Sequence, residues 1–179
     1  TLRVVDTIEE AVAHGDVVFI AVQTPHQAEY EGITRMPETR ADFSYEALKA
    51  AVFQVSDAAK QLQKHIAMVV ISTVLPGTSE RELYPIIRDN PYVSFIYDPY
   101  FIAMGTVISD HLNPEFVLIG TDAGMYHRSA LDKVQDFYRS LHNKEHRVMS
   151  VKSAELCKVA YYVFLGLKII AANAIMEIA

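Results

Sequence analysis

One lysine stands out as a candidate for chemistry. Lys158 lies in a strongly apolar stretch, and its helical neighbours Val159, Tyr162 and Leu165 are large hydrophobic side chains. A lysine on such a face is expected to line a cleft, because its stem packs on apolar surface. A cation fixed in a cleft stabilises a developing oxyanion, which is a strong form of electrostatic catalysis. The residues around Lys158 therefore predict that it lines a cleft, where such a cation could act.

Small polar residues at the ends of apolar runs form a second group. Residues 16–22 lead to Thr24 and residues 65–72 lead to Thr73, and a proline follows closely in each case. A third run, residues 93–97, also ends in a turn that contains proline. Three such strand ends, separated by helical patterns, describe one rim of a parallel sheet. Ligands of these sheets bind at the carboxyl ends of the strands, so a ligand site is expected there.

Strands and helices alternate along the chain. Strands are expected at 16–22, 65–72, 93–97, 116–120 and 146–150, and helices at 7–14, 42–62, 79–88, 105–112, 124–141 and from 153 onward. This alternation predicts an α/β fold with a largely parallel sheet, flanking helices and a long C-terminal helix. Apolar spacing predicts two inward faces, formed by Leu48, Val52, Val55, Ala59 and Leu62, and by Leu131, Val134, Tyr138 and Leu141. Ser79 and Glu82 are expected to form a capping box.

The composition narrows the class of protein. A chain of 179 residues is one domain by length, and a formal net charge of -6 argues against a nucleic-acid partner, which needs a basic patch. A phosphate-bearing ligand is still possible, since helix N-termini bind phosphate without net positive charge. The seven histidines include a single i,i+4 pair, His142 and His146, which spans a helix end and a strand start. No metal site is therefore expected.

Two further features bear on location. The lone cysteine, Cys157, excludes an internal disulfide, suits the reducing cytoplasm and is expected to be a buried core thiol. The chain opens on Thr1 without a charged and then apolar leader, and residues 159–179 are long and apolar. Lys168 lies near the middle of that stretch and Glu177 near its end, and a charge at mid-span is costly in lipid. We therefore expect a long buried helix and no membrane partner.

Five short motifs, in this order and spacing, resemble the UDP-glucose/GDP-mannose dehydrogenase family. They are residues 19–25 (FIAVQTP), 72–74 (STV), 99–106 (PYFIAMGT), 112–114 (LNP) ahead of the strand that ends at Gly120, and 153–158 (SAELCK). The resemblance covers nearly the whole chain. It implies a Rossmann-like NAD(P)-binding domain over residues 1–151 without its glycine-rich first unit, since no G-x-G-x-x-G turn occurs. Residues 152–179 would begin a central helix.

The resemblance also implies an activity. Members of the family oxidise the CH2OH group of a nucleotide sugar to a carboxylate with NAD. By this resemblance, the residues that contact NAD are Val22, Thr24, Pro25, Ser72, Thr73 and Met104. The residues that border the sugar are Tyr100, Phe101, Ile102 and Lys158, with Lys158 facing the reacting carbon.

The loop and the helix also depart from the family pattern. Tyr100 and Met104 stand where the family carries glutamates, and Tyr162 replaces the asparagine expected four residues after the lysine. Tyrosine can donate a hydrogen bond and titrate, but it replaces a carboxylate at neutral pH only with a large pKa shift. The candidate catalytic residues are therefore Lys158, Tyr100 and Tyr162. The family's catalytic cysteine is expected outside this sequence, since Cys157 points about 100° away from Lys158 on the helix.

These departures leave two alternative hypotheses open. The first is a two-electron dehydrogenase of the hydroxyacid type, which also uses a helix lysine. The second is a non-catalytic homologue that binds NAD or a nucleotide sugar, in which the two tyrosines serve packing. In every case we expect a cytoplasmic protein that forms a homodimer through residues 155–179, the element by which the family associates.

Overall fold

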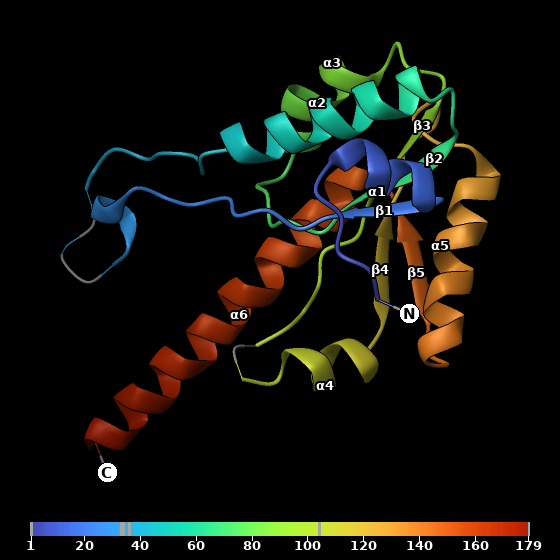
Figure 1. Ribbon diagram of the computed structural model, residues 1–179. Coiled ribbons are helices and arrows are strands. Elements are labelled where there is room, and N and C mark those ends of the chain that lie inside the picture. Colours follow the sequence, from blue (N-terminus) through green and yellow to red (C-terminus); the bar gives the residue numbers. More distant parts are fainter. Residues whose placement is uncertain (1, 33–34, 36, 104, 179) are drawn as a thin grey trace.

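The computed structural model describes residues 2–32, 35, 37–103 and 105–178 (Figure 1). The strands are β1 (Val17–Ile20), β2 (Ile66–Val70), β3 (Val93–Tyr97), β4 (Val117–Gly120) and β5 (His146–Met149). The helices are α1 (Ile8–His14), α2 (Glu46–Gln61), α3 (Tyr84–Ile87), α4 (Val107–Leu112), α5 (Arg128–Leu141) and α6 (Val151–Ile178). A 3-10 turn, Ala28–Tyr30, interrupts the long loop after β1, and a π-helical turn, Ser79–Leu83, leads into α3.

The five strands form one sheet in the order β1-β2-β3-β4-β5. Neighbours pair in parallel except β3 and β4, which meet in antiparallel fashion through one pair, Tyr97 opposite Gly120. The predicted α/β fold with a largely parallel sheet is confirmed. The carboxyl ends of β1, β2 and β3 share one edge, so the residues that follow these strands lie near one another.

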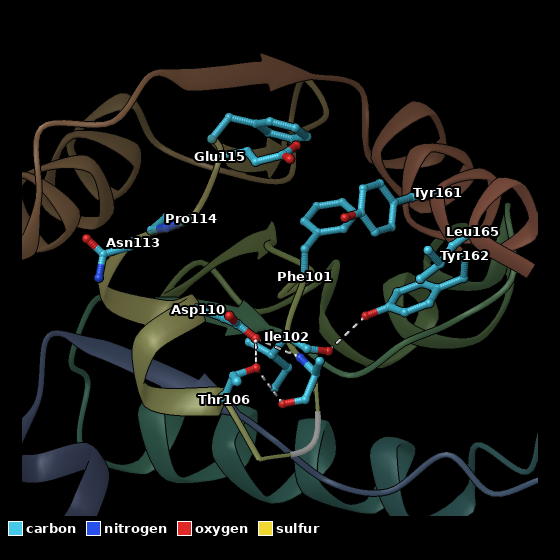
Figure 2. A pocket seen from close by; sticks show the side chains of 12 residues that line it. Phe101, Ile102, Thr106, Asp110, Asn113, Pro114, Glu115, Tyr161, Tyr162 and Leu165 are labelled. Carbon is cyan, nitrogen blue, oxygen red and sulfur yellow. Dashed lines mark hydrogen bonds between the residues drawn. The ribbon is translucent and has the colours of Figure 1, made fainter. Parts of the chain in front are cut away.

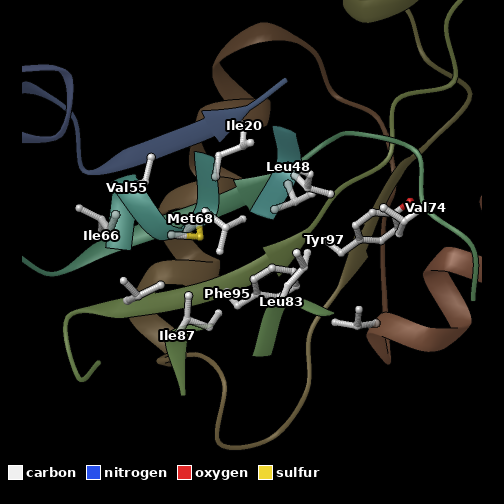
Figure 3. Packing of buried hydrophobic residues seen from close by; sticks show 14 of the residues in the cluster. Ile20, Leu48, Val55, Ile66, Met68, Val74, Leu83, Ile87, Phe95 and Tyr97 are labelled. Carbon is white, nitrogen blue, oxygen red and sulfur yellow. The ribbon is translucent and has the colours of Figure 1, made fainter. Parts of the chain in front are cut away.

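Two hydrophobic clusters hold the helices on the sheet. One contains Met68 and Phe95 from the strands with Leu48 and Val55 from α2 (Figure 3). The other packs α5 on the opposite face through its inward side chains, Leu131, Val134 and Tyr138. The 3-4 spacing predicted these faces correctly except at two positions. Leu62, just past α2, and Leu141, the last residue of α5, are exposed because solvent covers the ends of these helices.

Two local predictions were wrong because hydrogen bonds to side-chain carboxylates change the local structure. The second helix begins at Glu46 rather than Asp42, because the Asp42 carboxylate accepts bonds from the Phe43 amide and the Tyr45 hydroxyl. The capping box of Ser79 does not form, because the Ser79 amide donates to Glu155 of α6 instead (2.9 Å). The Ser79 amide is thus satisfied by a partner distant in sequence, and the Phe43 amide by its neighbour Asp42.

The first turns of α6 pack on the junction of β3 and β4. A side chain at Gly120 would lie 3.0 Å from the Ala154 Cβ and the Val151 Cα, and 3.3 Å from the Tyr97 Cβ. Only glycine lets the helix approach the sheet this closely. Lys158, two turns further along α6, is thereby held above the shared strand ends.

The rest of α6 extends away from the sheet (Figure 1). Its buried residues are Val151, Ala154, Glu155 and Lys158, whereas Phe164 and Ile170 are 65% and 66% exposed. The expected long buried helix is therefore wrong for most of its length. By length and composition alone α6 could cross a membrane, a test that core helices of soluble proteins also pass.

Candidate active site

A cavity of about 740 Å³ opens at the carboxyl ends of β1 and β2. Its walls are the segment after β1, the segment after β2, the loop after β3 and the first exposed turns of α6. Among its lining residues are Val22, Thr24, Ser72, Thr73, Tyr100, Ile102, Lys158 and Tyr162. These residues are separated by up to 140 positions in the sequence, and parallel strand order brings them together.

Hydrogen bonds tie the first two walls to each other. The Ser72 hydroxyl donates to the Val22 carbonyl (2.7 Å) and accepts from the Val22 amide (3.1 Å). The Thr24 hydroxyl donates to the Thr73 carbonyl (2.7 Å). The two segments therefore form one continuous rim rather than two independent loops.

Lys158 forms the third side of the cavity and is only 4% exposed. Its ammonium donates to the Tyr100 carbonyl and lies 4.3 Å from the centre of the Tyr162 ring and 5.1 Å from that of Phe101. Burial lowers the pKa of Lys158 to about 8, because a charge removed from water is disfavoured. The lysine is thus desolvated, oriented and able to exist in both protonation states near neutral pH.

A second cavity, of about 300 Å³, lies beside the first (Figure 2). Phe101 and Tyr161 form an aromatic wall with ring centres 4.9 Å apart. Tyr162 and Ile102 line both cavities, and the Tyr162 hydroxyl donates to the Ile102 carbonyl (3.1 Å). The strip of loop from Phe101 to Ile102 therefore separates the two spaces.

The loop continues into α4 through a compact turn. The Asp110 carboxylate accepts from the Ala103 amide (2.9 Å) and from the Thr106 hydroxyl (2.7 Å), and these bonds lower the pKa of Asp110. Residues 101–103 are thereby attached to α4 on one side and to α6 on the other.

Some predicted site residues lie elsewhere. Phe101 lines the second cavity rather than the first, and Pro25 lies outside the lining of both, with its carbonyl accepting from the Ser44 amide (2.8 Å). Met104 lies outside the described residues. Cys157 is an exposed free thiol, so the expected core thiol is wrong. On α6 the buried face is that of Glu155 and Lys158, and Cys157 follows on the opposite side.

Glu155 is a buried residue that lies within the motif of residues 153–158, but the sequence analysis did not identify it as functional. Its carboxylate is fully buried and accepts from the amides of Gly77 and Ser79, at the start of the segment that leads into α3. Its position could have indicated a role, because a glutamate three residues before Lys158 lies on the same face of the helix. Glu155 attaches α6 to the segment after β2 that also carries Thr73.

Comparison with known proteins places this architecture in a family. Residues 1–142 match the NAD binding domain of the UDP-glucose/GDP-mannose dehydrogenase family. The chain belongs to this family. UDP-glucose 6-dehydrogenase of Rhizobium meliloti (strain 1021) is 34% identical over 182 residues, which cover 99% of this chain and 38% of that protein. UDP-glucose 6-dehydrogenase 1 of Oryza sativa subsp. japonica is 30% identical, over 93% of this chain and 34% of that protein.

Solved structures of the family share the fold. A UDP-glucose dehydrogenase from Pyrobaculum islandicum matches with a TM-score of 0.79 and 29% identity, over 96% of this chain and 37% of that one. A GDP-mannose dehydrogenase from Pseudomonas aeruginosa matches with a TM-score of 0.77 and 25% identity, over 93% and 36%. The chain thus spans little more than a third of the length of these relatives.

Membership in this NAD-binding family implies NAD as the cofactor. The chemistry of the larger cavity fits such a ligand. Val22, Ile71 and Leu75 give it apolar walls, and Thr24 and Thr73 place polar groups at the strand ends. Among the described residues that line it, the one charged side chain is the cation Lys158. Apolar surfaces with a few polar groups suit the rings and riboses of a dinucleotide.

Proposed function

We propose that this chain is the part of a nucleotide-sugar dehydrogenase that binds NAD and carries the catalytic lysine. The observation that supports the proposal most is the single cavity in which the ends of β1 and β2 face Lys158. Relatives that match nearly the whole chain are named UDP-glucose 6-dehydrogenases. The proposed reaction is the oxidation of a sugar CH2OH group to a carboxylate. Residues 1–151 would form the NAD-binding domain and 152–179 the start of a central helix.

Each side of the cavity has a proposed role. Val22, Thr24, Ser72 and Thr73 would hold NAD, which when bound supplies the hydride acceptor. Lys158 would donate to the oxygen of the alcohol and stabilise the negative charge that develops there, in a desolvated place where such charge is strongly felt. With a pKa near 8, the same lysine can also hold or release the proton of the alcohol.

The loop after β3 would border the sugar. Tyr100 and Ile102 line the larger cavity, and Phe101 lines the adjoining one, so the substrate would lie along residues 100–102 with Lys158 behind it. We retain Pro25 and Met104 as proposed contacts of the cofactor on the strength of the family motif alone. The lone thiol and the family favour a cytoplasmic location.

One observation favours the two-electron alternative. The Tyr100 hydroxyl is bonded to Tyr138 and the Tyr162 hydroxyl to the Ile102 carbonyl, so both tyrosines are engaged within the fold. Among the described residues that line the larger cavity none is a carboxylate. A single hydride transfer needs only one proton acceptor, whereas oxidation to a carboxylate needs a second round of chemistry.

The stoichiometry of NADH decides between these hypotheses. We would supply the complete protein with a limiting amount of UDP-glucose or GDP-mannose and excess NAD, and follow NADH fluorescence to completion. Two NADH for each sugar support the four-electron enzyme, one supports the two-electron enzyme, and binding of NAD without any NADH supports the non-catalytic homologue.

Substitution of the lysine tests its role. Lys158→Ala should lower kcat by about 10²–10³-fold and leave the Kd for NAD within a few-fold, because the lost interaction belongs to the transition state. Lys152→Ala is the matched control, since Lys152 lies on the same helix but is exposed and pairs with Glu80 (3.1 Å). Equal activity of the Lys158 variant and the control would contradict the proposed role.

A further inference from the structure

A buried carboxylate lies at the start of the substrate loop. Asp98 follows directly on β3 and is only 2% exposed. Its side chain accepts a hydrogen bond from the Tyr138 hydroxyl on α5, and its backbone amide donates to the Val70 carbonyl of β2 (2.9 Å). Asp98 is thus fixed to two elements, and its charge has one described side-chain donor to compensate it.

The bonds continue from Asp98 toward the cavity. A hydrogen bond joins the hydroxyls of Tyr138 and Tyr100 (2.9 Å). A phenol has one hydrogen, so when Tyr138 donates to Asp98 the hydrogen between the two tyrosines belongs to Tyr100. Asp98, Tyr138 and Tyr100 therefore form one directional chain of hydrogen bonds that begins at the carboxylate.

Tyr100 connects this series of hydrogen bonds to the proposed catalytic lysine, Lys158. Its hydroxyl is held on the α5 side of the sheet by Tyr138, while its carbonyl accepts from the Lys158 ammonium on the α6 side. The position of this carbonyl fixes the direction of the Lys158 side chain. The bond from Tyr100 to Tyr138 therefore acts on the same residue whose carbonyl orients Lys158.

We propose that Asp98 and Tyr138 are positioning residues, which hold Tyr100 so that its carbonyl orients Lys158 in the cavity. The proposal deepens the proposed function, because Lys158 is the catalytic group of that site. In this proposal the acidic group that acts on the loop is Asp98. Where Tyr100 stands in place of a family glutamate, a carboxylate two residues earlier controls the loop from inside the fold.

Titratable groups in and around the hydrogen-bonded series of Asp98, Tyr138 and Tyr100 make this series sensitive to pH. Burial raises the pKa of Asp98 to about 7, against the bond from Tyr138, and raises that of Tyr100 to about 12. Three imidazoles face Tyr138: His111 from α4, His142 from the end of α5 and His146 from β5, with ring centres 5.8–6.3 Å away. Burial lowers the pKa of His146, and the nearby charge of Arg139 lowers it further. The charge of Asp98 therefore changes in the range in which the enzyme would work.

The protonation of Lys158 tests the proposal without substrate. Competitive acetylation with acetic anhydride at a series of pH values, read by mass spectrometry of the peptide that contains Lys158, should give a midpoint near pH 8 in the complete protein. Tyr138→Phe should raise this midpoint by about one pH unit or more, because a released loop admits water to the ammonium. Tyr126→Phe is the control: it removes a hydroxyl from a ring packed on the same cluster.

A second pair of variants separates position from packing. Asp98→Asn keeps an acceptor for Tyr138 and should leave the midpoint close to that of the wild type, whereas Asp98→Ala removes the acceptor and should raise it as Tyr138→Phe does. An unchanged midpoint in a folded Tyr138→Phe variant, or an equal rise in Tyr126→Phe, would overturn the proposal. Thermal unfolding identifies variants that fail to fold.

Kinetics distinguish this proposal from the proposed function. If the wild type oxidises a nucleotide sugar, Tyr138→Phe should lower kcat at least tenfold with little change in the KM for NAD, and Asp98→Asn should restore most of the loss seen in Asp98→Ala. If the wild type oxidises no sugar but the acetylation midpoints shift as expected, the proposed function fails and the positioning role stands.

Discussion

Lys158 and Asp98 are buried groups of opposite charge, and burial moves their pKa values toward each other. The pKa of Lys158 falls to about 8 and that of Asp98 rises to about 7, because in both cases the neutral form is favoured away from water. Near neutral pH each group is therefore present in both forms. Residues with pKa values close to the working pH are suited to proton transfer, and they also make stability depend on pH.

Asp98→Asn should stabilise the protein at pH 8. The folded pKa of about 7 lies above the ordinary value of 3.8, so the contribution of Asp98 to stability is greatest below pH 4 and is lost progressively as the pH rises to about 7. At 1.36 kcal/mol for each pKa unit, the loss in the wild type is at most roughly 4 kcal/mol. Urea unfolding at pH 5 and pH 8 measures the part of this loss that falls above pH 5. The free energy of unfolding of the variant, relative to that of the wild type, should rise from pH 5 to pH 8. Equal changes in the free energy of both proteins would contradict this.

At the scale of elements, the position of the site depends on how the start of α6 meets the sheet. Glu155 binds the segment after β2, Lys158 binds the loop after β3, and Gly120 lets the helix approach the junction of β3 and β4. Three contacts within two turns fix the helix against the segment after β2, the loop after β3 and the junction of β3 and β4. A change at Glu155 or Gly120 should alter the site without touching a ligand.

Glu155→Gln should destabilise the fold by about 1–3 kcal/mol, because a charged acceptor of two amide bonds becomes a neutral one. Glu177→Gln on the exposed part of the same helix should change stability by less than about 0.5 kcal/mol. Urea unfolding at pH 7.5 compares the two. A loss of the same size in both variants would show that the buried bonds contribute little.

Two glycines should respond to alanine in opposite directions. Gly120→Ala should cost about 1–3 kcal/mol, because the new methyl group meets Ala154 and Val151 at 3.0 Å. Gly166→Ala, in the exposed part of α6 with no atom near its added methyl, should stabilise the helix by about 0.5–1 kcal/mol. Thermal unfolding of the two variants gives both signs in one experiment, and stabilisation by Gly120→Ala would refute the close packing.

The sequence predicted the elements better than their partners. Continuous apolar runs located the strands, and 3-4 spacing located the inward faces of α2 and α5, because both patterns follow from local geometry. Glu155 and the bond between Asp98 and Tyr138 join segments 40 or more residues apart, and only the fold brings such residues together. The burial of α6 was predicted wrongly because a helix that is apolar all round reads the same whether or not another element covers it.

At the scale of the molecule, the exposed part of α6 is the feature that supports the proposed homodimer. Its side chains from Val163 to Ile178 are largely apolar and exposed, and monomeric proteins rarely leave such a surface in water. Lys168 opposes a membrane span, since a charge at mid-helix is costly in lipid. We therefore favour a second copy of the chain as the partner, packed helix against helix.

We expect charges on α6 to convert the proposed dimer of the complete protein to a monomer. Phe164→Asp together with Ile170→Asp places two carboxylates on side chains that are 65% and 66% exposed, where a helix interface would bury them at a cost of several kcal/mol. Asn173→Asp adds a charge to the same helix without removing an apolar group. This control should leave the molecular mass of the assembly in solution unchanged. Light scattering after gel filtration gives the masses. A wild-type monomer at high concentration would contradict the dimer, and flotation of that monomer with phosphatidylglycerol vesicles would assign the apolar helix to a membrane instead.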